Sequence, residues 1–233
     1  MKIFSYTGKG RRKTNEDYYA NVQFDESTSL HIVADGMGGY SYGDVAAYTA
    51  AEAVVKHFSS KYHEQDTEQI IRKSLKIANE QILQKQKTLQ AKLGTTIAGV
   101  FIREHIAYAF WLGDIQIYHF RNQELIFISE SHSLVNEMRK SNVLLNKDIE
   151  RFSNIVTKSL SGSGLTEIPV AKFELNHNDA ICICSDGFYR ESDVDKFINL
   201  SEEERVELLE NNLQTSKDNY TIVLIEFVDE NRF

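Results

Sequence analysis

The 233-residue sequence has little proline, cysteine or tryptophan, with one Pro, two Cys and one Trp. Two cysteines exclude a disulfide-rich fold, and Cys182 and Cys184 are too closely spaced for an ordinary disulfide. We expect both thiols to lie buried on one face of a strand, in a reducing compartment. No apolar run approaches the ~18 residues of a membrane-spanning helix, and no signal-peptide core follows Met1. These absences predict a cytoplasmic protein with no membrane partner.

The sequence also lacks an excess of basic residues. Lys and Arg number 26 against 34 Asp and Glu, a net charge of −8, which makes the chain a poor general binder of nucleic acid. The acidic excess has two open explanations, solubility or carboxylates grouped to hold cations. The hydrophobic fraction of 42% is that of a globular protein, and no linker or charge block divides the chain. We therefore expect a single domain over residues 1–233.

Hydrophobic periodicity predicts two long helices between strand-rich ends. They are expected at residues 44–62, capped by Asp44, and at residues 67–89. A short helix at 133–140, an irregular stretch at 142–152 and a helix at 193–213 follow. Strands are expected at residues 30–34, 95–103, 106–112, 115–121, 124–128, 170–175, 180–184 and 220–228. Short hairpin spacings favour antiparallel pairing, so the pattern predicts an α+β fold.

Acidic residues lie beside turns at four predicted strand ends. These residues are Glu16 with Asp17, Asp35, Asp186 and Asp218. Carboxylate oxygens are the ligands that Mg²⁺ and Mn²⁺ prefer, and a following glycine lets a backbone carbonyl approach an ion. Each Asp-Gly pair is equally typical of an ordinary turn, and whether the sites meet depends on the fold.

Six segments in this order resemble the motifs of the protein phosphatase 2C family, the metal-dependent serine/threonine phosphatases, in their bacterial form. They are Gly-Arg-Arg-Lys-Thr-Asn-Glu-Asp at 10–17, Val-Ala-Asp-Gly-Met-Gly-Gly at 33–39, Gly-Thr-Thr at 94–96, Trp-Leu-Gly-Asp at 111–114, Cys-Ser-Asp-Gly-Phe at 184–188 and Asp-Asn-Tyr-Thr at 218–221. The resemblance implies a central sandwich of two antiparallel β-sheets flanked by helices on both sides. It also places a metal site at one end of the sandwich.

The resemblance assigns roles to residues of this chain. One ion would be held by Glu16, Asp35 and the carbonyl of Gly36, and a second by Asp35, Asp186 and Asp218. Arg12 would grip the substrate phosphate, and its neighbours Arg11 and Lys13 are expected to be solvated surface. The residues expected to support these ligands are Asp17, Asp114 and Asn219.

The implied activity is hydrolysis of phosphoserine and phosphothreonine by a water activated between two Mn²⁺ or Mg²⁺ ions, with Arg12, Asp35 and Asp186 as catalytic residues. Met37 stands where eukaryotic members often carry histidine, so a water held by the ions is the expected proton donor. The implied partners are phosphoproteins made by a bacterial Ser/Thr kinase, and the chain is expected to be a monomer. The alternatives are a weak or inactive member that acts as a binding module, and a cation-binding protein without catalysis.

The sequence departs from the family pattern at two places. The family's Gly-Asp-Ser-Arg motif reads Gly-Asp-Ile-Gln at 113–116, which keeps Asp114. Ser131 stands where an aspartate usually helps to hold a third ion, and Glu130 would point the other way on an extended segment. A third ion is therefore predicted to be weak or absent. The resemblance implies that the stretch 135–152 corresponds to the family's flap beside the active site.

Overall fold

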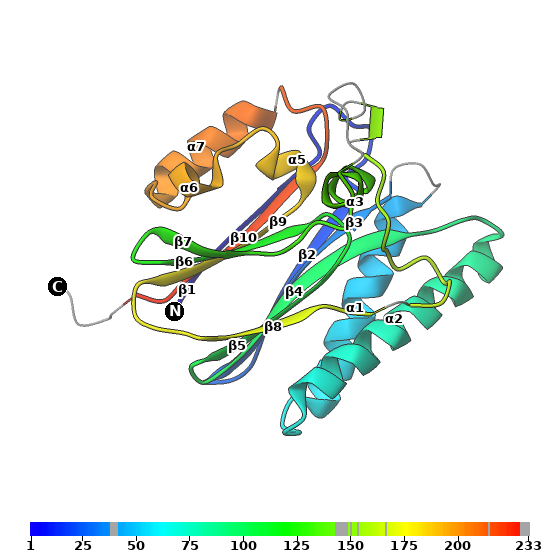
Figure 1. Cartoon of the computed structure of the whole chain (residues 1–233), viewed down its shortest axis with the longest axis horizontal. Coiled ribbons are helices and arrows are strands. Elements are labelled where there is room, and N and C mark those ends of the chain that lie inside the picture. The colour runs from blue at the N-terminus through cyan, green and yellow to red at the C-terminus, as the bar shows by residue number, and fades with distance from the viewer. Residues whose placement is uncertain are drawn as a thin grey trace.

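Two five-stranded antiparallel sheets pack face to face in the computed structural model (Figure 1). It describes residues 1–37, 42–142, 149, 151–152, 154–165, 167–213 and 215–228. The first sheet has the order β1-β10-β9-β6-β7 and the second the order β2-β3-β4-β5-β8. The strands are β1 (Lys2–Gly8), β2 (Asp17–Asp25), β3 (Thr28–Gly36), β4 (Thr95–Arg103), β5 (Ile106–Leu112), β6 (Gln116–Arg121), β7 (Glu124–Ile128), β8 (Val170–Glu174), β9 (Asp179–Cys184) and β10 (Tyr220–Glu226).

Helices cover the outer faces of both sheets, which confirms the predicted α+β sandwich. The long antiparallel pair α1 (Gly43–Lys61) and α2 (Thr67–Leu89) lies on the second sheet. The first sheet is covered by α5 (Asp186–Tyr189), α6 (Val194–Phe197) and α7 (Glu202–Leu213). A short helix, α3 (Leu134–Lys140), lies near one end of the sandwich (Figure 1).

Three apolar layers hold these elements together. The layer between the sheets contains buried residues such as Val33, Ile117 and Val223. The layer under α1 and α2 is built on Phe58, Phe101 and their neighbours. The third layer, under α5 to α7, includes both cysteines, which are free thiols with no exposed surface, on one face of β9 as predicted.

The predicted helix at 193–213 is wrong, because the chain turns between α6 and α7. Ser201 and Glu204 form a capping box: the Ser201 N–H donates to Glu204 at 2.8 Å and the Glu204 N–H to Ser201 Oγ at 3.3 Å. Asp44 is also not the cap of α1. It lies in the first turn, and Tyr42 precedes the helix with a φ of 70° and no side-chain cap.

The N-terminal strands β1 and β2 were not individually predicted, and they form the edges beside β10 and β3. The short helix after residue 133 is confirmed, with Ser133 as its cap. Of the predicted irregular stretch at 142–152, residues 143–148 and 150 lie outside the described residues. Within the described residues, no helix is long and apolar enough to cross a membrane.

Candidate metal and phosphate site

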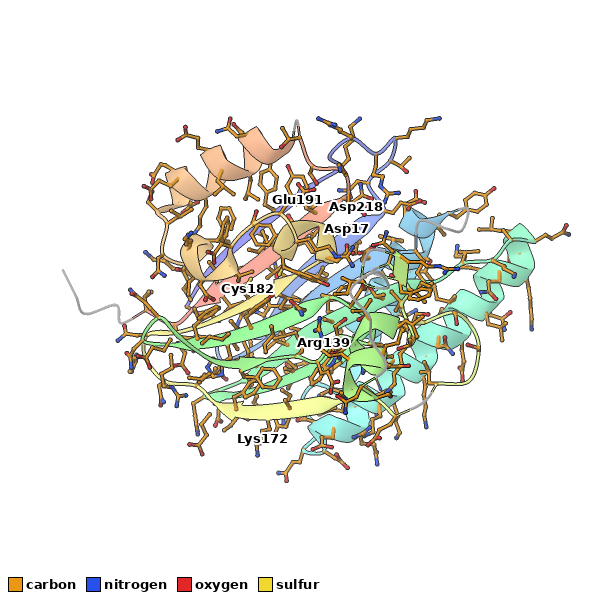
Figure 2. The ribbon with its side chains drawn as sticks, turned by 45° about the horizontal axis from the view of Figure 1, so that its top comes forward. Asp17, Arg139, Lys172, Cys182, Glu191 and Asp218 are labelled. Atoms are coloured by element: carbon orange, nitrogen blue, oxygen red, sulfur yellow. The ribbon has the colours of Figure 1, made fainter. Side chains whose placement is uncertain are left out.

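The predicted site residues converge at one end of the sandwich, around a cavity of about 460 Å³. They come from the β1–β2 connection and the start of β2, the end of β3, the β5–β6 turn, the segment after β9 and the segment before β10. Figure 2 shows Asp17 and Asp218 close together at this end, while Cys182 lies farther along β9. The predicted residues that line the cavity are Arg12, Glu16, Asp35, Gly36, Asp114, Asp186, Asp218 and Asn219. The fold therefore brings together segments that lie far apart in the sequence.

Glycines allow these segments to approach closely. A Cβ on Gly36 would lie 2.3 Å from the carbonyl oxygen of Gly43, at the start of α1. A Cβ on Gly187 would lie 2.0 Å from the carbonyl oxygen of Asn219. Packing therefore requires glycine in both Asp-Gly pairs, since a larger residue would push Asp35 or Asp186 away from its partners.

Glu16 lies against the N-terminus of α1. The Gly43 N–H bonds to its carboxylate, which suits the partial positive charge at a helix start. Burial nevertheless raises the pKa of Glu16, with Asp44 adding repulsion and Arg12 opposing it. The backbone is fixed as well, because the Gly36 N–H donates to the Glu16 carbonyl at 3.0 Å.

Asp17 and Asp35 are directly opposite each other in the β2–β3 register. Burial, followed by the charge of Asp17, raises the pKa of Asp35 well above its usual range. Burial raises the pKa of Asp17 to about 7, although the Thr221 and Ser185 hydroxyls donate to it. Two carboxylates facing each other across a strand pair are unfavourable without a counter-charge, and Asp17 Oδ1 is buried with no hydrogen-bond partner.

Asp17 is not among the residues that line the cavity, and it is joined to the segment that carries Asp186. Its Oδ2 accepts a hydrogen bond of 2.7 Å from Ser185, the residue before Asp186. Asn219 supports the site through the backbone. Its Oδ1 accepts from the Glu16 N–H at 2.9 Å, and its Nδ2 donates to the carbonyls of Lys9 and Thr14 at 2.9 and 3.0 Å.

Sequence reasoning missed Arg190. It lies on the turn after α5, four residues beyond Asp186, and pairs with the Asp186 carboxylate at 3.1 Å and with Asp114 at 4.0 Å. Burial raises the pKa of Asp186 even so, and it raises the pKa of Asp114 to about 6. An Asp-x-x-x-Arg spacing would have indicated the pair only if residues 186–189 had been expected to be helical.

Arg12 extends from the β1–β2 turn to the rim of the cavity. It donates to Asp218 Oδ2 at 2.9 Å, and both side chains are more than a third exposed. Burial acts to lower the pKa of Arg12, but the hydrogen bond to Asp218 and the charges of Asp218, Glu16 and Asp186 together raise it. Thr96, from the Gly-Thr-Thr motif, also lines the cavity, as do Asn154 and Val156, which the sequence did not indicate.

The donor set is made of oxygen atoms, which suits hard cations such as Mg²⁺ and Mn²⁺. In the parts of the chain that the structure describes, no three His, Cys, Asp or Glu residues form a ready-made cation site. Cations held here would therefore complete their coordination with water, as magnesium usually does. The raised carboxylate pKa values and the orphaned Asp17 oxygen both indicate a site that lacks positive charge.

Comparison with known proteins agrees with the geometry. The chain is 27% identical to the serine/threonine phosphatase stp of Listeria welshimeri. The matched region covers 94% of this chain and 93% of that protein. The Mycobacterium tuberculosis serine/threonine phosphatase PstP/Ppp superposes with a TM-score of 0.85 at 20% identity, covering 98% of this chain and 99% of that one. A structure of the PstP catalytic domain with two manganese ions gives 0.82 at 21% identity, with 98% of each chain covered. A sequence model described as Protein phosphatase 2C matches residues 9–221, and the chain belongs to the protein phosphatase 2C family.

Proposed function

We propose that this chain is a protein serine/threonine phosphatase that uses two divalent cations, held at the carboxylate-lined cavity. The observation that carries the proposal is the convergence of Glu16, Asp35, Asp186 and Asp218 around one cavity, with Arg12 at its rim. Carboxylates alone describe a cation site, and the guanidinium adds a group that matches phosphate oxygens. The supported reaction class is therefore hydrolysis of a phosphate monoester.

The ligand assignment is the one that the family resemblance implies, and the lining of the cavity is consistent with it. Asp35 belongs to both proposed sets, with Glu16 and the Gly36 carbonyl on one side and Asp186 and Asp218 on the other. Two divalent cations bound there would supply an acidified water and neutralise the charge of the phosphoryl group. We take the ions to be Mn²⁺ or Mg²⁺ because the donors are all oxygen.

The chain's own residues bind the substrate and hold the ligands in place. Arg12 would turn from Asp218 to the substrate phosphoryl oxygens, which it can contact with two parallel N–H donors. Arg190 orients Asp186 through their 3.1 Å contact, and its charge opposes the effect of burial on the pKa of Asp186. Ser185 links Asp17 to the same segment, so that Asp17 fixes the turn that carries Asp186.

A third ion is proposed to be weak or absent. Ser131 offers no carboxylate, and its carbonyl accepts a hydrogen bond from the Asn136 side chain at 2.9 Å. The neighbouring Glu130 pairs with Lys140 and accepts from Asn136, away from the cavity lining. A crystal grown in manganese and measured at its absorption edge should show two strong anomalous peaks, and an ordered third peak beside Ser131 would contradict this assignment.

We further propose that the substrates are phosphoproteins made by a bacterial Ser/Thr kinase, and that the chain acts as a cytoplasmic monomer. The similarity to a protein named serine/threonine phosphatase supports phosphoproteins as the substrates. The non-catalytic alternatives are less well supported, because all four proposed ligands line the cavity and Arg12 is in place.

The test is hydrolysis of p-nitrophenyl phosphate and of a phosphothreonine peptide in the presence of Mn²⁺. Asp35→Ala and Asp186→Ala should lose nearly all activity, because each removes a proposed ligand. Asp195→Ala is the matched control, since it removes one exposed carboxylate on α6 and should retain wild-type rates. Inactive wild-type protein with every divalent cation, or active ligand variants, would refute the phosphatase assignment.

A further inference from the structure

The turn between β1 and β2 carries four cationic residues within positions 9–13. Three of them are Lys9, Arg11 and Lys13, all exposed, and the fourth is Arg12 at the cavity rim. A further exposed lysine, Lys217, precedes the proposed ligand Asp218. We call Lys9, Lys13 and Lys217 the basic rim. These positive charges lie beside a carboxylate cavity on a protein whose net charge is −8.

The basic rim is built on a fixed backbone. The Arg11 N–H donates to the Ser216 carbonyl at 3.0 Å, and the Asn219 amide donates to the carbonyls of Lys9 and Thr14. Gly10 has a φ of +55°, and a Cβ there would lie 2.4 Å from the Asp218 carbonyl oxygen. The turn is therefore locked onto the segment that carries Asp218, which fixes where the lysine side chains begin.

Among the described residues, no carboxylate forms an ion pair with any of the three lysines of the basic rim. Arg12, in contrast, pairs with Asp218. Like charges gathered on one turn repel each other, and an approaching anion relieves that repulsion. The turn also places Lys9 next to Arg12, since the Arg12 N–H donates to the Lys9 carbonyl at 3.2 Å. A phosphoryl group at Arg12 would thus lie beside the turn that carries Lys9 and Lys13.

We propose that the basic rim selects substrates that carry a second anionic group close to the phosphorylated residue. The group is a carboxylate or a second phosphoryl within about three residues, because Cα atoms lie ~3.8 Å apart and lysine side chains are long. This inference rests on the proposed phosphatase function. The inference goes beyond that function because it names a class of substrates and three residues that recognise this class.

The experiment compares phosphothreonine peptides with alanine flanks, glutamate flanks and a flanking non-hydrolysable phosphonate. The measured quantity is the ratio of kcat/KM for each anionic peptide to that for the alanine peptide, so a general loss of activity cancels. The triple variant Lys9→Gln/Lys13→Gln/Lys217→Gln removes the basic rim. The matched control, Lys73→Gln/Lys76→Gln/Lys87→Gln, removes three exposed lysines of α2.

In the wild type we expect the ratio to be about 3 to 10 at low salt, because each exposed ion pair contributes modestly. It should fall towards 1 in the basic-rim variant and at high salt, and stay unchanged in the control. A larger ratio for the phosphonate peptide would identify a second phosphoryl as the preferred group, and equal ratios would identify any anion. A kcat/KM ratio near 1 in the wild type, or a ratio that is unchanged in the triple variant, would refute the proposed role of the basic rim. The proposed phosphatase function would still stand. No turnover of any peptide would refute both.

Discussion

The carboxyl group of Asp17 should destabilise the metal-free protein at neutral pH. It is buried opposite Asp35, has one oxygen without a partner, and has a pKa raised from 3.8 to about 7. A carboxyl with a raised pKa binds its proton more tightly in the folded chain than in the unfolded chain. The contribution of the Asp17 carboxyl to the free energy of unfolding is therefore fully present below about pH 4. It is lost as the pH rises from about 4 to about 7.

The size of the effect follows from the same pKa. Each pKa unit corresponds to about 1.4 kcal/mol, so the shift at Asp17 bounds the loss at roughly 4 kcal/mol between these pH values. In Asp17→Asn the side chain cannot ionise and can still accept from Ser185. We expect this variant to be more stable than the wild type at pH 7.5 by up to about 4 kcal/mol, and to match it near pH 4.

The assay is urea unfolding in EDTA at several pH values, compared between wild type and Asp17→Asn. Other groups also titrate, such as Asp179: burial acts to raise its pKa, but the bond to Arg121 and further hydrogen bonds lower it. Such groups titrate alike in both proteins, so their effect cancels in the difference between the two unfolding free energies. Asp195→Asn serves as the control because it removes one exposed charge away from the cavity. Mn²⁺ should reverse the order at neutral pH, since it stabilises the wild type more. A stability difference that does not change with pH would refute this reasoning.

Three further substitutions test the structure of the site and its support. Asn219→Ala removes three hydrogen bonds to the backbone at Glu16, Lys9 and Thr14. It should lower the free energy of unfolding by about 2–3 kcal/mol in urea. It should also lower the Mn²⁺ affinity by roughly 10- to 100-fold in a calorimetric titration. Gly187→Ala should cost about 2–4 kcal/mol in urea unfolding and most of the activity, whereas Gly164→Ala, with no atom within 4 Å of its Cβ, should change neither. Arg205→Ala breaks a two-fold contact with Glu226 at 2.8 and 2.9 Å and should lower Tm by roughly 5–10 °C with p-nitrophenyl phosphate turnover retained at low temperature.

The helices and the central strands could be predicted because their local signals agree with their packing. The helix at Thr67–Leu89 has an Asp66 cap that bonds to the Gln69 N–H at 3.0 Å and a regular apolar stripe, so both ends are readable from the sequence. The residues at 193–213 show the opposite case. Their composition is helical throughout, but Ser201 and Glu204 restart the helix, and a capping box inside a helical pattern is easily read as part of the helix.

The candidate site could be predicted from motifs but not from physics alone. No local signal places Asp35 near Asp186; the β2–β3 register, the sheet packing and two crowded glycines do so together. Arg190 lay beyond prediction for a related reason. Its contact with Asp186 depends on a single helical turn after β9, too short to leave a periodic pattern.

The net charge of −8 is unevenly distributed, and the site explains how the fold tolerates it. Six carboxylates gather at the cavity and behind it, while Arg12 and Arg190 supply two positive charges, which leaves four negative charges uncompensated if all the groups are ionised. Burial first, with a smaller part from neighbouring carboxylates, raises the pKa of Asp17, Asp35 and Asp114, so in the metal-free protein these groups bind protons more readily than free carboxyls and the repulsion is reduced. Two divalent cations would relieve it with the four positive charges that are missing. Half of the acidic excess is therefore matched to the proposed ions, and with those ions bound the proposed basic rim would supply positive charge beside a neutralised cavity.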